Sequence, residues 1–346
     1  MDLSLFDFNL PEHCIAQNPA SKRDGAKLLH VTNHDVQDLR IPDIVRLFNE
    51  QDVLVLNDTR VIPARLLGKR ETIDIEILLH KQLDDVCWRV FAKPAKRLRV
   101  GQRIIFSPSC YATVIEKYAS GEIKLQFDVK DGTLWQAIQQ LGEVPLPPYI
   151  ARPDGVNTSD ASRYQTVYAK HHGSVAAPTA GLHFTQSLLE SLASQGVTIL
   201  YVTLHVGGGT FLPVKVQDTN DHVMHSEYGE LSEDVAEALN HARIAGKRIV
   251  AVGTTSLRIL ESTTDEAGIV HPFRGETDIF ITPGYQFRCV DRLLTNFHLP
   301  KSTLFMLVSA FAGLSTMHSA YQHAINSDYR FYSYGDACLL EKELLG

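Results

Sequence analysis

The order of hydrophobic and polar residues divides the chain into two kinds of segment. In the first kind, a continuous apolar run rich in β-branched residues ends in a polar cluster, which is typical of a strand covered on both faces of a sheet. Three such runs occupy residues 52–58, 197–206 and 248–253. The helical patterns that alternate with them occupy residues 186–195, 233–245 and 256–262. This alternation predicts a larger α/β domain with a mixed sheet and flanking helices.

The second kind of segment fills residues 62–147, where apolar and polar residues alternate over short distances. Short strands are predicted at residues 72–80, 87–93, 102–107, 112–117 and 122–129. Turn residues separate them and one helical pattern, residues 134–141, ends the segment, as expected for a small antiparallel β-barrel. We therefore expect an α/β catalytic domain made of residues 1–61 and 148–346, with a β-barrel domain of residues 62–147 inserted into it.

Composition narrows the function classes only slightly. The 346 residues are 44% hydrophobic and 21% charged, as in an ordinary globular protein. A net charge of −7 argues against a surface that is basic throughout, but it leaves room for a local basic face. No apolar run reaches the ~20 residues that a membrane-spanning helix needs, and residues 1–13 lack the features of a signal peptide. We expect a cytoplasmic protein with no membrane contact.

The cysteines predict neither a zinc site nor a disulfide framework, because no CxxC spacing occurs. We expect free and mostly buried thiols at Cys14, Cys87, Cys110, Cys289 and Cys338.

Three polar clusters follow the predicted buried strands, at residues 57–60, 207–210 and 254–256. Ligands of open α/β sheets bind at the carboxyl ends of strands, so the clusters point to one site. The glycines at 207–209 can cradle a ligand with backbone amides or simply form a turn. They fit neither GxGxxG nor the P-loop, so ATP and dinucleotide binding are not supported. Residues 254–256 can hold a carboxylate or phosphate at a helix start, or only cap it.

The stretch of residues 164–185 is unusually polar and irregular. Small residues around Thr179 leave its backbone amides open to a ligand. His183 lies beside them, and Thr185 is a predicted N-cap for the helix that follows.

Two further segments carry histidines. Residues 221–227 include His225 and Glu227, which are candidates for general acid–base chemistry, with an ordinary polar loop as the alternative. HxxH occurs there without HExxH or a nearby cysteine, so no metal is expected. Residues 295–303 include His298 and Ser302, which can bind a ligand or cap the apolar segment that follows.

A basic run within the predicted barrel spans residues 93–103 and contains no acid. Together with Arg60 and further basic residues at 65–70 it predicts a basic edge. A solvated strand face is the usual explanation for such a run. Contact with a phosphate backbone is the functional alternative, and small barrels often bind oligonucleotides.

Taken together, the motifs resemble those of the S-adenosylmethionine:tRNA ribosyltransferase-isomerase (QueA) family nearly end to end. The segments that carry the resemblance are LNDTRVIPARLLG at 56–68, KPAKRLRVGQ at 93–102, VPLPPYI at 144–150, RYQTVYAKHHGSVAAPTAGLHFT at 163–185, HVGGGTFLPV at 205–214, MHSEY at 224–228, VGTTSLRILES at 252–262, TNFHLPKSTLFMLVSAFAG at 295–313 and YRFYSYGDA at 329–337.

The resemblance implies both the reaction and the fold. S-adenosylmethionine is the co-substrate and donates its ribosyl group to 7-aminomethyl-7-deazaguanine at the wobble position of a tRNA. The sugar is isomerised, adenine and methionine leave, and epoxyqueuosine-tRNA is the product. No metal and no redox cofactor are implied, and the family has a small β-barrel inserted in an α/β domain.

The resemblance and the chemistry it requires suggest roles for the candidates. A base must remove a proton at C5′ of the donor, and an acid must help adenine to leave. The candidate bases are Glu227 and His225, and the candidate acids are His183 and His298. The donor-binding candidates are Gly207, Gly208, Gly209, Thr210, Thr254, Thr255, Ser256 and Thr179. The tRNA-binding candidates are Asp58, Arg60, Lys93, Lys96, Arg97 and Arg99.

Three other function classes stay open from sequence. A methyltransferase would use the same donor and release S-adenosylhomocysteine. An RNA-binding module without catalysis would need only the basic barrel. A metal hydrolase would draw on the histidines and lose activity with a chelator.

Overall fold

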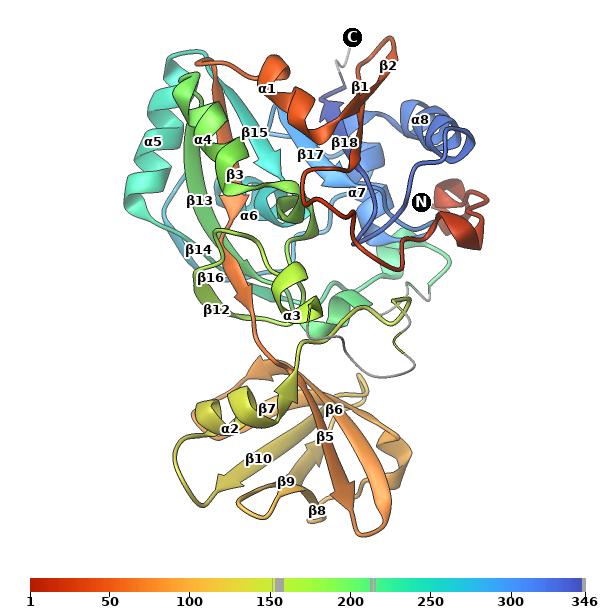
Figure 1. The fold of residues 1–346 in the computed structure, drawn as a ribbon, viewed down its shortest axis with the longest axis vertical. Helices are drawn as coiled ribbons and strands as arrows, with labels where there is room; N and C mark the ends of the chain where they lie inside the picture. The colour runs from red at the N-terminus through yellow and green to blue at the C-terminus, as the bar shows by residue number, and fades with distance from the viewer. Residues whose placement is uncertain (151, 153–158, 212–213, 215, 344–346) are drawn as a thin grey trace.

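A large sheet with helices on both faces stands above a small β-barrel (Figure 1). The computed structural model describes the chain except residues 151, 153–158, 212–213, 215 and 344–346, and it leaves the side chains of residues 210 and 211 undescribed. The fold class predicted from the sequence is confirmed, since a mixed α/β part and an antiparallel barrel are both present.

The large sheet is mixed. From edge to edge its strands are β16 (Phe273–Thr277), β14 (Glu227–Leu231), β13 (Thr198–His205), β3 (Asp52–Asn57), β15 (Arg248–Val252), β17 (Arg292–Asn296), β18 (Ala337–Glu341), β1 (Lys27–Val31) and β2 (Val36–Arg40). The central strands β13, β3, β15 and β17 run parallel, whereas β14 and β16 at one side and β18 and β2 at the other introduce antiparallel pairs. The predicted buried strands therefore lie at the centre of the sheet.

Strand β3 shows why the apolar runs are continuous. Val53 and Val55 belong to the hydrophobic core on one face, and Leu54 and Leu56 belong to the core on the other. Successive side chains of a strand point to opposite faces, so a strand covered on both sides is apolar along its central residues. The first face packs against helices α5 (Glu233–Ile244), α6 (Thr254–Thr263), α7 (Thr303–Ala312) and α8 (Leu314–Asn326), and the second against α1 (Ile44–Leu47) and α4 (Gln186–Ser194).

Helix starts follow the capping pattern of the sequence. The predicted N-cap Thr185 accepts a hydrogen bond from the backbone N–H of Leu188 at 3.1 Å. Ser302 does the same for α7, with the N–H of Phe305 at 3.1 Å. The helix predicted at 256–262 begins two residues earlier, because Gly253 provides the turn into it.

The barrel is a closed sheet. Its strands follow the order β5 (Arg65–Arg70), β6 (Ile73–Gln82), β7 (Cys87–Lys93), β10 (Ile123–Val129), β9 (Cys110–Lys117) and β8 (Arg103–Ser107). Pairing of Lys69 with Ile105 joins β5 to β8 and closes the circle. The short β11 (Gly142–Glu143) extends the sheet at β5, and α2 (Leu134–Leu141) packs on the barrel, whose core is separate from those of the large sheet.

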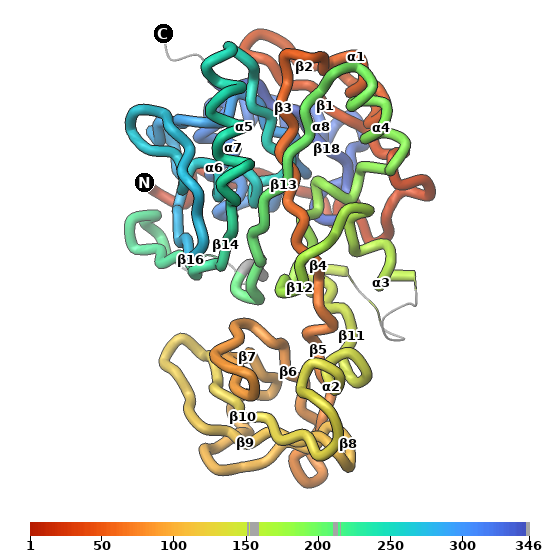
Figure 2. Tube along the Cα trace, turned by 90° about the vertical axis from the view of Figure 1, so that its left-hand side faces the viewer, coloured from red at the N-terminus to blue at the C-terminus, as the bar shows by residue number. Residues whose placement is uncertain are grey.

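A small parallel pair joins the two parts of the molecule. β4 (Thr59–Val61) pairs with β12 (His171–Ser174), and Figure 2 shows both between the large sheet and the barrel. The N–H of Ile62 donates to the carbonyl oxygen of Ser174 at 2.9 Å just before the chain enters the barrel. The remaining helices are α3 (Asp160–Arg163) and the 3₁₀ helices η1 (Leu3–Phe6), η2 (Glu12–Cys14), η3 (Ile41–Asp43), η4 (Ala95–Arg97), η5 (Thr179–His183), η6 (Gly208–Phe211) and η7 (Thr219–Asp221).

All five cysteines are free and buried, as the sequence predicted. In the part of the chain that the structure describes, no single helix is long and apolar enough to cross a membrane. The helices α7 and α8 reach that length and composition only as a pair, across a bend of 113°.

Candidate active site

A cavity lies where the central strands of the large sheet end. Val206 follows β13, Gly253–Thr255 follow β15, and Thr295–His298 end β17 and follow it. Their convergence is expected, because the carboxyl ends of parallel strands share one edge of a sheet. The rest of the wall comes from Tyr149, Tyr164, Ala176, Ala177, Pro178, Thr179, Ala180, Glu227, Arg258, Leu304, Tyr332 and Ser333. We call this space the donor cavity.

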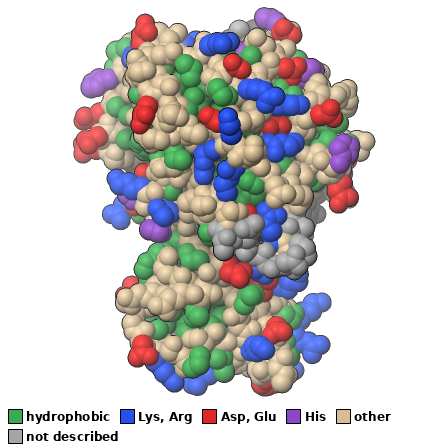
Figure 3. Space-filling model, in the orientation of Figure 1, with side chains coloured by type: hydrophobic (Ala, Val, Ile, Leu, Met, Phe, Trp, Pro, Cys, Tyr) green, Lys and Arg blue, Asp and Glu red, His purple; other side chains and the backbone are tan. Residues whose placement is uncertain are grey.

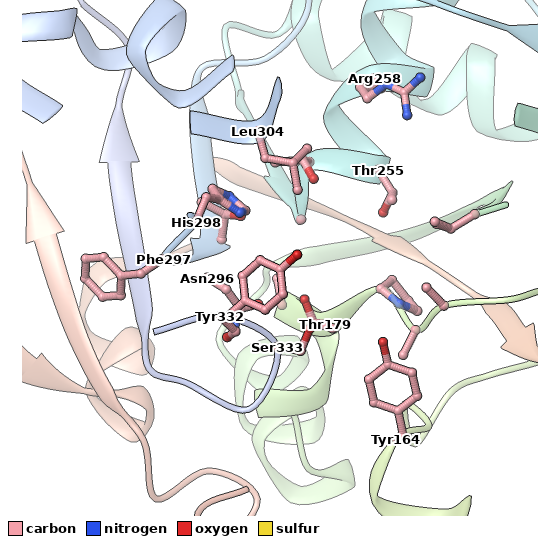
Figure 4. A pocket seen from close by; sticks show the side chains of 18 of the residues that line it. Tyr164, Thr179, Thr255, Arg258, Asn296, Phe297, His298, Leu304, Tyr332 and Ser333 are labelled. Atoms are coloured by element: carbon pink, nitrogen blue, oxygen red, sulfur yellow. The ribbon is translucent and has the colours of Figure 1, made fainter. Parts of the chain in front are cut away.

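Five of the predicted site residues meet in the donor cavity: Glu227, His298, Thr179, Thr254 and Thr255. Figure 4 shows side chains from separate segments, among them Thr179, Ser333 and Tyr332, around one space. The ring of Phe297 points away from it, into the hydrophobic core.

Glu227 lies at the start of β14 and is only 8% exposed. Its Oε2 atom accepts a hydrogen bond from Nη1 of Arg258, a residue of α6 that is equally buried. Its other oxygen has no hydrogen-bond donor among the described residues. The buried carboxylate needs a cationic partner such as Arg258, because an unpaired charge in the interior is strongly unfavourable.

Sequence reasoning missed Arg258. The signal was present, since a single arginine stands in a helix whose neighbouring residues Leu257, Ile259 and Leu260 are fully buried. A charged residue among fully buried neighbours points to a buried partner or ligand.

The two candidate acids differ in position. His298 lines the donor cavity, and its Nε2 lies 3.1 Å from Oγ1 of Thr295. His183 lies behind the wall, 3.3 Å from the amide nitrogen of Asn296. Burial lowers the pKa of His298 to about 3 and that of His183 to about 4. Both imidazoles are therefore neutral at neutral pH, and an acid role requires protonation in the substrate-bound state.

Aromatic side chains supply apolar area in the donor cavity. Tyr149 and Tyr332 contact each other edge to face with ring centroids 3.8 Å apart, and the Tyr149 hydroxyl donates to Ser333. Burial raises the pKa of Tyr332 to about 12, so its hydroxyl stays protonated and neutral. Such rings can stack on an adenine and attract a sulfonium cation.

A second cavity lies between the large sheet and the barrel. The barrel contributes His80, Lys81, Gln82 and Trp88, and the α/β part contributes His172, Gly173, His205, Val206, Gly207, Ser226, Glu227, Tyr228 and Glu276. We call this space the interdomain cleft. Val206 and Glu227 line it as well as the donor cavity, so one carboxylate borders both spaces.

Ion pairs and rings shape the interdomain cleft. Lys81 of the barrel pairs with Glu276 of β16 across it. His205 lies 2.7 Å from Oγ1 of Thr59 through Nδ1, and burial lowers its pKa and that of His172. Neutral imidazoles and the indole of Trp88 offer flat surfaces on which a base could stack.

The glycine loop lies against the barrel and not in the donor cavity. A β-carbon at Gly207 would come within 2.8 Å of the His80 ring, and one at Gly209 within 2.5 Å of the His225 ring. Gly208 faces Leu78 of the barrel. The absence of side chains here lets the two parts of the molecule approach closely.

Three further candidate residues, His225, Ser256 and Thr210, do not line the donor cavity in the described part of the structure. His225 lies beside His80 at the barrel contact, with ring centroids 5.9 Å apart. Ser256 is fully buried and donates to the carbonyl oxygen of Val252 at 2.9 Å. Thr210 belongs to η6, and its side chain lies outside the described part of the structure.

Asp58 and Arg60 lie close to the junction between the two parts, where β3 ends and β4 begins. Asp58 is buried, accepts a hydrogen bond from Thr203 at 2.7 Å and has a pKa raised by burial. Arg60 is exposed on β4 and near His172 of the interdomain cleft, where its charge contributes to lowering the pKa of that histidine.

The basic run lies at the far end of the barrel. β5 leaves the junction at Arg65 and ends at Arg70, whose side chain binds the carbonyl oxygen of Arg97. Lys96, Arg97 and Arg99 are exposed there, and Lys93 lines a groove on the barrel. Figure 3 shows Lys and Arg side chains at this lower end. Arg65 adds little to a basic edge, because it pairs with Glu76 and Glu143.

Within the described residues, no group of three His, Cys, Asp or Glu side chains is placed to hold a metal ion. The many histidines are instead distributed over the cleft, the cavity wall and the surface.

Comparisons of the sequence and of the structure with known proteins point to the same family. The chain matches the family described as "Queuosine biosynthesis protein" over residues 3–340. It is 54% identical to the S-adenosylmethionine:tRNA ribosyltransferase-isomerase of Rhodospirillum rubrum and 54% identical to that of a Methylobacterium species, covering 98% of both chains in each case. The crystal structure of an S-adenosylmethionine tRNA ribosyltransferase from Thermotoga maritima shares 33% identity and a TM-score of 0.55, over 97% of this chain and 99% of that chain. This chain belongs to the queuosine biosynthesis protein family.

Proposed function

We propose that the protein is an S-adenosylmethionine:tRNA ribosyltransferase-isomerase. It transfers and isomerises the ribosyl moiety of S-adenosylmethionine onto 7-aminomethyl-7-deazaguanine at the tRNA wobble position, with release of adenine and methionine. One observation carries the proposal beyond family membership: Glu227 borders both the donor cavity and the interdomain cleft. Two adjoining spaces with a shared group can hold both substrates of a transfer close together and oriented, which speeds the reaction.

In this proposal S-adenosylmethionine occupies the donor cavity. Its adenine and sulfonium lie against Tyr149 and Tyr332, and the hydroxyls of Thr179 and Thr254 bind its polar groups. The glycines 207–209 shape the boundary with the barrel, since a β-carbon at any of them would meet a barrel side chain or His225.

The acceptor nucleotide occupies the interdomain cleft. A modified base must leave the anticodon stack to react, and a flipped base is held by stacking and by polar contacts to its edge. Trp88, His172 and His205 supply rings, and Lys81 and Glu276 supply charged groups. The barrel thus completes the acceptor site, which explains why it is attached at this edge of the sheet.

Glu227 acts as the base and His298 as the group that assists adenine. Glu227 has one oxygen without a donor, at the boundary of the two spaces, where the donor C5′ proton would lie. His298 faces the donor cavity directly, whereas His183 contacts the wall residue Asn296 from behind.

The division into residues 1–61 and 148–346, with residues 62–147 inserted, is also part of the proposal. Separate hydrophobic cores support it. tRNA lies along the barrel, with the exposed basic run at its far end, and the enzyme works in the cytoplasm, where its tRNA substrate is found.

The test is a reaction of the purified protein with S-adenosylmethionine and a tRNA that carries 7-aminomethyl-7-deazaguanine. Free adenine, free methionine and epoxyqueuosine-tRNA are expected in equal amounts. Release of S-adenosylhomocysteine would identify a methyltransferase, and binding of tRNA without any product would identify an RNA-binding module. Loss of activity with a chelator would point to a metal enzyme.

The base assignment has its own test. Glu227→Gln should lower kcat by at least about 100-fold, the low end of the effect of removing a general base. His225→Gln is the matched comparison, because His225 lies at the barrel contact. Normal turnover by the Glu227 variant would contradict the assignment.

A further inference from the structure

Arg258 lines the donor cavity and, among the described residues, has one edge of its guanidinium without a partner. Its side chain is 8% exposed, and Nη1 donates to Glu227. Nε and Nη2 are buried and have no hydrogen-bond partner among the residues that the structure describes. These two nitrogens form one edge of the guanidinium, from which parallel N–H groups meet a bidentate acceptor. Buried cationic donors without an acceptor are unfavourable, so this edge indicates a missing ligand group.

A second unpaired donor lies on the same face of α6. Oγ1 of Thr255 is buried and, within the described part of the chain, has no partner. Thr255 and Arg258 are three residues apart, which makes them neighbours on a helix surface, and both line the donor cavity (Figure 4).

The first turn of α6 adds an electrostatic potential that favours an anion. Its N-cap is Gly253, which has no side chain to cap the backbone N–H groups of the turn. Free amides and the helix dipole attract an anion at this position. The helix has ten residues, so the dipole is developed.

We propose that Arg258, Thr255 and the first turn of α6 bind the α-carboxylate of the methionyl part of S-adenosylmethionine. The inference rests on the proposed function, since it deepens the donor site. A carboxylate is planar and bidentate, which matches the free guanidinium edge. The tRNA phosphates belong to a polymer that reaches the interdomain cleft, on the other side of Glu227.

The ion pair with Glu227 then has a second consequence. It holds the guanidinium through Nη1 and leaves the opposite edge free for the ligand. The same contact connects the carboxylate-binding residue to the proposed base, so donor binding and base orientation depend on each other.

The experiment compares two donors in equilibrium binding to the full-length protein by titration calorimetry. One donor is S-adenosylmethionine, and the other is decarboxylated S-adenosylmethionine, which lacks only the carboxylate. A tRNA with guanine at the wobble position is present, because it has no aminomethyl nitrogen and prevents turnover. The wild type should prefer S-adenosylmethionine on the order of 100-fold, from the strength of charge-assisted hydrogen bonds.

Arg258→Gln should abolish most of this preference by weakening the binding of S-adenosylmethionine alone. Because that change leaves Glu227 buried without its partner, the double variant Arg258→Gln with Glu227→Gln restores charge balance and should show the same loss of preference. Thr255→Val changes one hydroxyl and should reduce the preference by several-fold. Arg46→Gln, at an exposed arginine of α1, controls for removal of a guanidinium.

The outcomes separate this inference from the proposed function. Equal binding of both donors by the wild type, or an undiminished preference in the double variant and in Thr255→Val, would overturn the carboxylate site alone. A wild type that binds neither donor and forms no adenine with its proper tRNA would overturn the proposed function and, with it, this inference.

Discussion

Gly253 is the residue on which the position of α6 depends. It has φ +87° and ψ 153°, a backbone conformation that is nearly restricted to glycine. A β-carbon there would have room, with the nearest atom 3.6 Å away, so strain and not collision decides the outcome. Gly253→Ala should lower the free energy of unfolding by about 1–3 kcal/mol in urea titration. It should also raise the KM for S-adenosylmethionine, because the first turn of α6 shifts.

Gly275→Ala is the control for that change. Gly275 lies in β16, and an added β-carbon would make only an ordinary contact with Phe273 at 3.5 Å. If the two alanine variants were equally stable, alanine would fit the backbone conformation at position 253 without strain, and the prediction would be wrong.

The buried His298 should make the free energy of unfolding depend on pH. Burial lowers its pKa to about 3, below the unfolded value of 6.5. The unfolded state therefore binds a proton first as the pH falls, and the stability present at pH 7 is lost progressively below 6.5. Between pH 7 and pH 5 the wild type should lose about 2 kcal/mol more than His298→Gln in urea unfolding. The exposed His13→Gln is the control, and parallel pH curves for wild type and His298→Gln would contradict the prediction.

At the scale of single residues, much of the candidate site can be predicted from the sequence. Thr254 is predicted from its place after an apolar strand, and Glu227 and His298 from polar segments rich in acid–base side chains; the structure brings all three to one cavity. Arg258 and Tyr332 are not predicted, since a buried ion pair or an edge-to-face ring contact depends on partners distant in sequence. The sequence allows the glycines at 207–209 to be a ligand cradle or a turn, because close approach to a barrel leaves the same pattern as close approach to a ligand.

At the element scale, Ser302 distinguishes helix capping from ligand binding. Its hydroxyl accepts from the N–H of Phe305 and caps α7. Ser302→Ala should cost about 1 kcal/mol of stability and leave the KM for S-adenosylmethionine unchanged. Thermal unfolding and steady-state kinetics measure the two effects. Ser302→Asp retains a capping side chain and should recover most of the stability, whereas a raised KM in the alanine variant would mean that Ser302 contacts the donor.

Elements were predictable where local chemistry defines them. Caps at Thr185 and Ser302, and the continuous apolar run of β3, are encoded within a few residues. The strand order is not, because it depends on pairings between remote segments. β18 joins β1 through residues such as Leu29 and Cys338, which are separated by nearly the whole chain. No local pattern carries that information.

At the scale of the whole molecule, the barrel and the large sheet contribute to a shared space. The cleft has barrel residues on one wall and strand ends on the other, and the Lys81–Glu276 pair crosses it. In the proposed function, the barrel is therefore placed where the second substrate enters. A tRNA bound in the cleft would extend beyond it, and the barrel lies directly below the large sheet (Figures 1 and 2).

The basic run tests how far the tRNA extends. Lys96, Arg97 and Arg99 are exposed at the barrel end farthest from the large sheet. If tRNA lies along the barrel, changing all three to Glu should weaken its binding and reduce the slope of log K against log salt by about 2–3 units, since each phosphate contact releases close to one counterion. Arg46→Glu, on the α/β surface, is the control and should leave the slope unchanged. Catalysis at saturating tRNA should persist in the triple variant, because none of its residues lines the donor cavity or the cleft. An unchanged affinity and slope would mean that the tRNA leaves the cleft in another direction and that this run only solvates the barrel.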